Sequence, residues 1–162
     1  MKIIKELYDY REMLSNLVKK DLKVRYKGSV LGFLWTFLNP LLQLIVYTIV
    51  FSTIMKVDID KFYIYLFIGL IPWLFFATCI QAGSVSILMN KDLIKKIYFP
   101  RIILPISTVN SAFMNMFYSM IVVILTILVS GIGFSKYILL LPLAMIMQYI
   151  LVLGMTFIFS AL

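Results

Sequence analysis

Neutral hydrogen-bonding side chains recur at helical spacing inside two long apolar segments of this sequence. Within each segment they step by three or four residues, so they share one face of a helix. A polar face turned toward lipid would be costly, so these faces are expected to meet protein or water. They predict hydrogen bonding between helices, a pore wall that offers neutral groups to a solute, or both. The candidate pore-lining residues are Thr36, Asn39, Gln43 and Tyr47 in the first segment and Ser107, Ser111 and Asn115 in the second.

Residues that carry acid–base, nucleophilic or metal chemistry are scarce in the apolar parts of the chain. The sequence has no histidine, and no aspartate or glutamate falls within its four long uncharged segments. Proton-coupled transport and intramembrane hydrolysis usually need such groups, and no phosphate-binding loop is present. The single Cys79 cannot form an internal disulfide. We therefore expect no catalytic, cofactor-binding or metal-binding residues, and a partner must supply the energy for any uphill movement.

The uncharged segments set the architecture. They span residues 28–55, 62–90, 102–135 and 137–162, and each exceeds the ~20 residues that a helix needs to cross a hydrocarbon core of about 30 Å. A charge at mid-membrane costs roughly 2.5–3.5 kcal/mol on insertion scales, so this spacing rarely arises by accident. Hydrophobic residues make up 63% of the chain and the mean hydropathy is +1.04. The sequence predicts an all-α, polytopic transmembrane protein with about four transmembrane helices.

The basic residues are distributed unevenly around these segments. Eight Lys and Arg precede residue 28 and four lie in residues 91–101, against two in residues 56–61 and one at position 136. The positive-inside rule therefore places the N-terminus and the 91–101 loop in the cytoplasm. The net charge of +8 is expected to meet anionic membrane lipids, and not nucleic acid, because the basic residues flank apolar spans. No basic anchor follows the fourth segment, so we expect the transmembrane domain 28–162 to be incomplete.

Residues 1–27 form a separate unit, which we predict to be a cytoplasmic amphipathic interfacial helix. Its apolar residues recur at helical spacing with lysines between them; they are Ile4, Leu7, Leu14, Leu17, Val18 and Leu22. Such a helix lies in the membrane interface with its basic face toward the headgroups. It is either an anchor that fixes the topology or a gate or collar around a pore entrance.

The loop from Asn90 to Arg101 has the pattern of a short amphipathic helix. Asn90 is a residue type that caps helices, and Pro100 is expected to end the helix. One face carries Leu93, Ile94, Ile97 and Tyr98, and the other carries Lys91, Lys95 and Lys96. The loop is therefore either a docking element for a partner protein or simply a basic loop on the cytoplasmic side.

Three stretches of the sequence resemble a known family of transport proteins. They are Asp21 to Trp35 with the following Leu38-Asn39-Pro40-Leu41, then Ile68 to Trp73, and then Leu93 to Arg101. In that order they are similar to segments of the ATP-binding-cassette permeases that export bacterial surface polysaccharides: O-antigen, capsule or teichoic acid. Members of this family carry six spans, so the resemblance implies that the transmembrane permease domain here lacks the last two.

The resemblance also implies a mechanism. Two copies of the permease would form a conduit in the bacterial inner (cytoplasmic) membrane, each a multi-pass chain with a cytoplasmic N-terminus. Separate ATP-binding subunits would drive export of a polysaccharide on a polyprenyl pyrophosphate lipid, without a cofactor. Coupling to the ATPase would fall to Leu93, Ile94, Lys95, Lys96, Ile97 and Tyr98. A cytoplasmic rim of cations that engages the pyrophosphate would consist of Lys23, Arg25, Lys27 and Arg101.

Two other function classes stay open at this point. An integral membrane enzyme acting on lipid-linked sugars would need acidic or histidine residues near an interface. The aspartates outside the far N-terminus form no paired motif; they are Asp21, Asp58, Asp60 and Asp92. A passive channel or scaffold would work without an ATPase, so a requirement for an ATPase subunit separates it from a permease.

Overall fold

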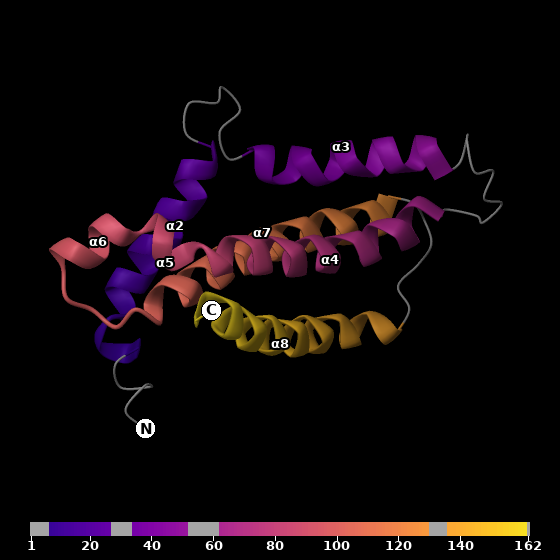
Figure 1. Ribbon diagram of the computed structural model, residues 1–162. Coiled ribbons are helices and arrows are strands. Elements are labelled where there is room, and N and C mark those ends of the chain that lie inside the picture. The colour runs from indigo at the N-terminus through magenta and orange to yellow at the C-terminus, as the bar shows by residue number, and fades with distance from the viewer. Residues whose placement is uncertain (1–6, 27–33, 52–61, 130–135, 162) are drawn as a thin grey trace.

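The computed structural model of the protein describes residues 7–26, 34–51, 62–129 and 136–161 (Figure 1). Every regular element among these residues is a helix. The elements are α2 (Arg11–Tyr26), α3 (Trp35–Ile49), α4 (Phe62–Ser84), α5 (Ser86–Met89), α6 (Lys91–Lys96), α7 (Ile103–Val129), the 3-10 helix η3 (Lys136–Leu140) and α8 (Leu141–Ala161).

Three helical stretches are long and apolar enough to cross a membrane: Ile64–Ser84, Ile103–Leu128 and Ile138–Ala161. They confirm the all-α membrane-spanning class and three of the expected spans. The first expected span, 28–55, lies partly outside the described residues. Within it, α3 is apolar but has only 15 residues. The second span ends earlier than the charge pattern indicates, because Val85 leaves the helical conformation (φ −97°, ψ 1°) and α5 follows.

One face of α4 forms the centre of the bundle. Its buried residues return every three or four positions, as a single helical face requires; they are Ile64, Phe67, Ile71, Phe75 and Cys79. This face packs against α7 and α8, where Val109, Val123 and Val152 are almost fully buried in the same core. In Figure 1, α8 lies on one side of the α4–α7 pair and α3 on the other. The contacts of α3 with α4 and α7 are less extensive than those of α8 with α4.

Two neighbouring polar side chains fix α8 to the other helices. The Gln148 amide (Nε2) donates a hydrogen bond of 2.7 Å to the carbonyl oxygen of Pro72 in α4. The Tyr149 hydroxyl donates one of 2.6 Å to Oδ1 of Asn110 in α7. Hydrogen bonds between membrane helices are worth about 0.6 kcal/mol on average, so their main effect is on the register of α8 and less on its affinity for the bundle.

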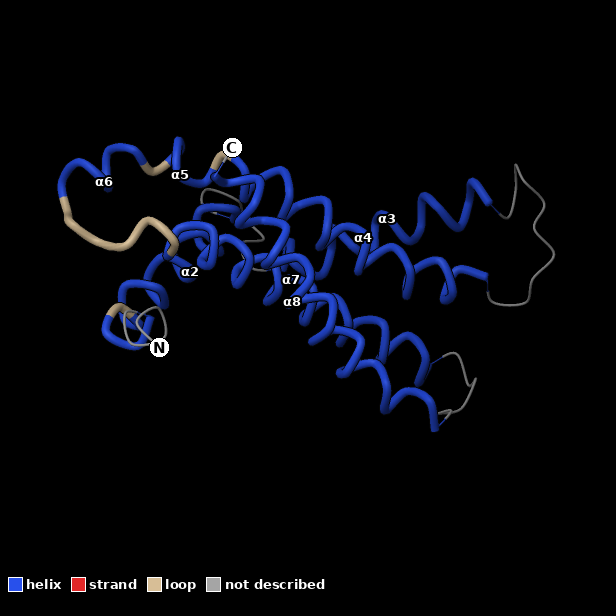
Figure 2. Tube along the Cα trace, turned by 60° about the horizontal axis from the view of Figure 1, so that its bottom comes forward, coloured by secondary structure: helices blue, strands red, loops and turns tan. Residues whose placement is uncertain are grey.

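A second apolar cluster joins α2 to the start of α7. Leu17 of α2 is buried with Phe99, Ile103 and Leu104, and we call these four residues the Leu17 cluster. Within the described residues, α2 turns an apolar face toward this cluster, while its position in the membrane interface stays a prediction. Figure 2 shows α2, α5 and α6 at one end of the bundle. We call this end the α6 end.

Candidate functional site: a neutral pocket and the α6 segment

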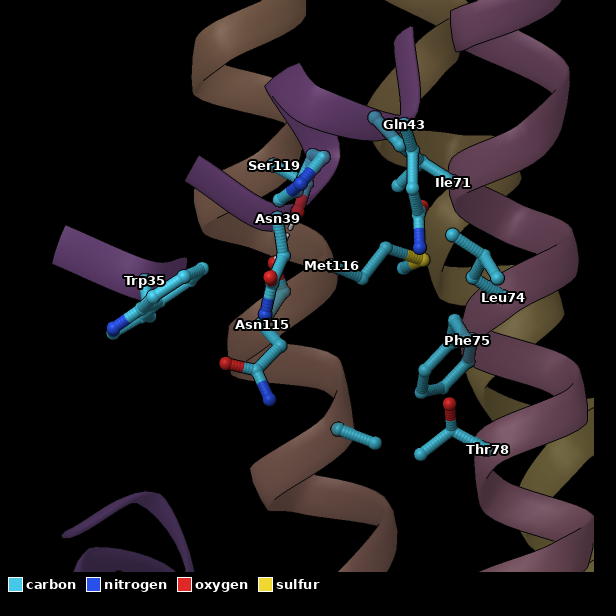
Figure 3. A pocket seen from close by; sticks show the side chains of 12 residues that line it. Trp35, Asn39, Gln43, Ile71, Leu74, Phe75, Thr78, Asn115, Met116 and Ser119 are labelled. Carbon is cyan, nitrogen blue, oxygen red and sulfur yellow. Dashed lines mark hydrogen bonds between the residues drawn. The ribbon is translucent and has the colours of Figure 1, made fainter. Parts of the chain in front are cut away.

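A pocket of about 210 Å³ lies between α3, α4 and α7. Figure 3 shows its side chains, with Trp35 at one side, Phe75 and Thr78 at the other, and Asn39 and Asn115 between them. Twelve residues line it: Trp35, Asn39, Pro40 and Gln43 from α3; Ile71, Leu74, Phe75 and Thr78 from α4; and Ala112, Asn115, Met116 and Ser119 from α7. The pocket therefore depends on the packing of three separate helices.

The pocket brings together part of the expected pore lining. Asn39, Gln43 and Asn115 all contribute to its wall, although they come from two different helices. Tyr47 does not line it and is 37% exposed on α3. The side chain of Thr36 lies outside the described part of the structure.

Ser107 and Ser111 have a different environment from Asn115. Both are buried outside this pocket. The Ser107 hydroxyl donates to the carbonyl oxygen of Leu104 at 2.8 Å, and the Ser111 hydroxyl donates to that of Thr108 at 2.9 Å. Serine hydroxyls in helices commonly bond to their own backbone in this way. These bonds satisfy the two hydroxyls inside α7 and do not require a solute.

Two further polar residues of the pocket were not among the expected pore-lining residues. Ser119 continues the four-residue spacing of Ser111 and Asn115, so this spacing could have identified it as a pocket residue. Its hydroxyl donates to the Asn115 carbonyl oxygen at 2.9 Å. Thr78 lies on α4, which is apolar on all sides, and no periodic pattern there distinguishes the pocket face from the lipid face.

The chemistry that this pocket offers is neutral hydrogen bonding. Amide side chains both donate and accept, as do hydroxyls, and none of the twelve lining residues carries a charge. The remaining wall is apolar or aromatic. Such a lining can hold an uncharged polar group, but it has no side chain suited to acid–base catalysis at neutral pH.

The α6 segment differs from the expected helix in length. Helix α6 ends at Lys96, and Ile97 is extended (φ −134°, ψ 131°). The chain stays non-helical through residues 98–100, so Pro100 does not end the helix. Asn90 occupies the N-terminal cap position but makes no side-chain cap bond; its Nδ2 donates instead to the Ser86 carbonyl oxygen at 2.8 Å. A helix of six residues gains little stability of its own, and tertiary packing determines its length.

The expected apolar face of this segment is divided between two environments. Leu93 and Ile94 are half-buried against the Leu17 cluster, so they contact the protein itself. Ile97 is 52% exposed and Tyr98 is 96% exposed. An open groove of about 520 Å³ separates α2 from α6, and Ile97 lines it together with Leu93. Only Ile97 and Tyr98 among these four apolar residues thus present most of their surface outward.

The basic residues near the α6 end are accessible where the structure describes them. Lys95, Lys96, Arg101 and Lys23 are all exposed. The side chain of Arg25 and the whole of Lys27 lie outside the described part, so half of the expected cationic rim can be placed.

Comparison with known proteins identifies the class to which this fold belongs. Residues 13–162 match the model of the ABC-2 type transporter family. The chain is a member of that family, whose membrane domain is the permease component of ABC exporters.

Individual relatives agree with this assignment. The chain is 36% identical over 162 residues to the O-antigen export system permease protein RfbA of Myxococcus xanthus, covering 100% of this chain and 62% of the relative. A protein of the same name from Klebsiella pneumoniae is 36% identical over 152 residues, covering 93% of this chain and 59% of the relative. The chain thus spans less than two thirds of the length of these relatives.

Proposed function

We propose that this chain belongs to the permease subunit of an ABC exporter that moves lipid-linked surface polysaccharide across the bacterial cytoplasmic membrane. The glycan is O-antigen, capsule or teichoic acid on a polyprenyl pyrophosphate carrier. ATP is hydrolysed by a separate ATP-binding subunit, and two permease copies form the conduit. The observation that carries the proposal is the similarity, over the whole chain, to relatives named as O-antigen export permeases.

The neutral pocket supports a carbohydrate substrate. Sugar hydroxyls donate and accept hydrogen bonds, and the amides of Asn39, Gln43 and Asn115 do the same. These amides form part of the wall of a pocket inside an apolar bundle. A passing glycan can exchange hydrogen bonds with them without requiring a charge in the membrane.

The α6 segment supports docking of an ATPase. Protein interfaces gain most of their energy from a few buried aromatic and apolar anchors, and Tyr98 and Ile97 are the exposed candidates here. Leu93 and Ile94 pack against the Leu17 cluster, which contains residues of α2 and α7, so movement of an ATPase docked at Tyr98 would be passed on to both helices. The neighbouring Lys95 and Lys96 would lie at the rim of the interface and contribute less.

The charge distribution supports an orientation. Exposed lysines of α2 and α6 gather at the α6 end of the bundle. The positive-inside rule then places this end, with the N-terminus, in the cytoplasm. The same end carries Lys23 and Arg101, which with Arg25 and Lys27 are the proposed contacts of the pyrophosphate, since cations and phosphate oxygens form strong charge-assisted hydrogen bonds.

A gene deletion tests this proposal. Cells that lack the permease are expected to lose the surface polysaccharide and to accumulate its lipid-linked form in the cytoplasmic membrane. The full-length gene should restore export, and a partner ATPase with an inactivated nucleotide site should reproduce the deletion. Immunoblotting of surface polysaccharide, with extraction of the lipid-linked pool, measures both effects. Unchanged surface polysaccharide in the deletion strain would contradict the proposal.

A further inference from the structure

The pocket between α3, α4 and α7 has the hydrogen-bonding capacity of a sugar-binding site. Five neutral polar side chains converge on it from three helices: Asn39, Gln43, Thr78, Asn115 and Ser119. Three are amides, each with two donor hydrogens and one acceptor oxygen, and two are hydroxyls. The Ser119 hydroxyl donates to the Asn115 carbonyl oxygen, so it offers a ligand its acceptor oxygen. A sugar ring likewise carries several hydroxyls that donate and accept, so the two sets are complementary.

The size of the pocket restricts what it can hold. Its volume of about 210 Å³ is below the roughly 300–1,000 Å³ of sites that take drug-sized ligands. One ring of a glycan is therefore the largest unit expected to fit. Asn39 is exposed, so the pocket is open enough for a ring that belongs to a longer chain.

The uncharged lining restricts the chemistry of that ring. A carboxylate placed among the Ile71, Leu74 and Met116 side chains would lose its hydration, and none of the twelve lining residues carries a positive charge to compensate. Burial of an unpaired charge is far more costly than burial of a hydroxyl that finds a partner. A lipid tail matches this lining less well, because it can form no hydrogen bond with any of the five polar side chains.

We propose that this pocket binds one uncharged sugar ring of the exported glycan and excludes rings that carry a carboxylate. The inference rests on the proposed function, and it adds a selectivity that export alone does not require. Trp35 and Phe75 give the site aromatic surface against which the apolar face of a ring can lie. Asn39, Gln43 and Asn115 would then bind the hydroxyls.

Trp35 makes the site measurable. The chain has two tryptophans, and Trp73 is 62% exposed and does not line the pocket. The variant Trp73→Phe leaves Trp35 as the single tryptophan among residues 1–162. The experiment uses the full-length protein in nanodiscs, with any tryptophan outside these residues also replaced. Its fluorescence is titrated with methyl glycosides of glucose, galactose, mannose and rhamnose, and with those of glucuronate and galacturonate.

A saturable change in Trp35 fluorescence is expected with at least one neutral glycoside. A ligand of this size is expected to bind at about millimolar concentration. The uronate with the same ring should give no change at tenfold higher concentration. Gln43→Met and Asn115→Leu should each weaken the binding by about tenfold or more, since each removes hydrogen bonds at similar volume. Ser107→Ala is the control, because Ser107 is buried in the same helix as Asn115 but outside the pocket.

Equal affinity for neutral and acidic rings would overturn the inference. So would the absence of any change with all the glycosides, and so would quenching of Trp35 by lipids with brominated tails, which would show that a lipid fills the pocket. Export by the same Trp73→Phe protein, measured in the deletion strain, tests the proposed export function separately from sugar binding in the pocket. If it exports normally without binding any glycoside, the proposed function stands and the pocket inference fails.

Discussion

The substitution Tyr98→Asp is expected to abolish both polysaccharide export and the co-purification of the ATPase. Tyr98 is 96% exposed, so a charge at this position has no buried neighbours to disturb within the chain. Loss of a central aromatic anchor typically costs about 2 kcal/mol or more, which is roughly a 30-fold loss of affinity. Membrane insertion and the elution volume of the purified permease should not change.

Matched variants make this result specific to the aromatic ring. Tyr98→Phe keeps the ring and should retain the ATPase, and Lys95→Ala should have only a mild effect because rim charges contribute little. Ile94→Asp is a poor probe, since Ile94 packs against the Leu17 cluster and its loss would disturb the fold. Undiminished ATPase recovery and export with Tyr98→Asp would show that the loop acts only in membrane topology.

The substitution Gly83→Ala is expected to destabilise the bundle, whereas Gly154→Ala should not. A Cβ atom at Gly83 would overlap the methyl group of Thr156, while nothing lies within 4 Å of a Cβ atom at Gly154. Thr156 is fully buried, and its hydroxyl donates to the Val152 carbonyl oxygen at 2.8 Å, so it has little room to move. Overpacking of this kind costs about 1–3 kcal/mol. At Gly154 alanine instead gains up to ~1 kcal/mol of helix propensity.

Thermal unfolding in detergent, followed by a thiol-reactive fluorophore, measures this difference. Cys79 is completely buried and is the only cysteine of the chain, so it reacts when the bundle opens. Gly83→Ala should lower the midpoint by several degrees, and Gly83→Ala with Thr156→Ala should recover most of the loss, because the overlapping methyl group is gone. A midpoint for Gly83→Ala as high as that for Gly154→Ala would contradict the close approach of α4 and α8.

Membrane energetics explains why the fold class could be predicted. Charged residues are excluded from membrane spans because burying a charge in hydrocarbon is costly, so they mark the limits of the apolar segments. Three of these segments are membrane-length helices in the structure. Amphipathic spacing likewise predicted the helix that contains Leu17. These signals are local and strong, because each depends on one segment and on its solvent and not on a neighbouring helix.

Tertiary contacts explain why the site could be predicted only in part. Spacing correctly places Ser107, Ser111 and Asn115 on a common stripe of α7, but that helix crosses several environments along its length. Ser107 and Ser111 are buried with hydroxyls bonded to their own helix, while Asn115 opens into the pocket. The periodicity also grouped Leu93 with Ile97 and Tyr98 on one face, yet Leu93 is half-buried against the Leu17 cluster while Ile97 and Tyr98 are exposed. A helical pattern shows which residues share a face, but not which neighbour that face meets.

A purified system can show whether ATP hydrolysis drives movement of the glycan through this permease. The full-length permease and its ATPase would be reconstituted in proteoliposomes with the nucleotide sites outward and lipid-linked polysaccharide in the outer leaflet. We expect ATP to move the glycan into the lumen, where an added glycosidase cannot reach it. A non-hydrolysable analogue or omission of the ATPase should leave the glycan accessible. Protection that develops equally without ATP would indicate a passive channel. Chemical conversion of the lipid-linked sugar without movement would indicate an enzyme, and either result would rule out an ATP-driven permease.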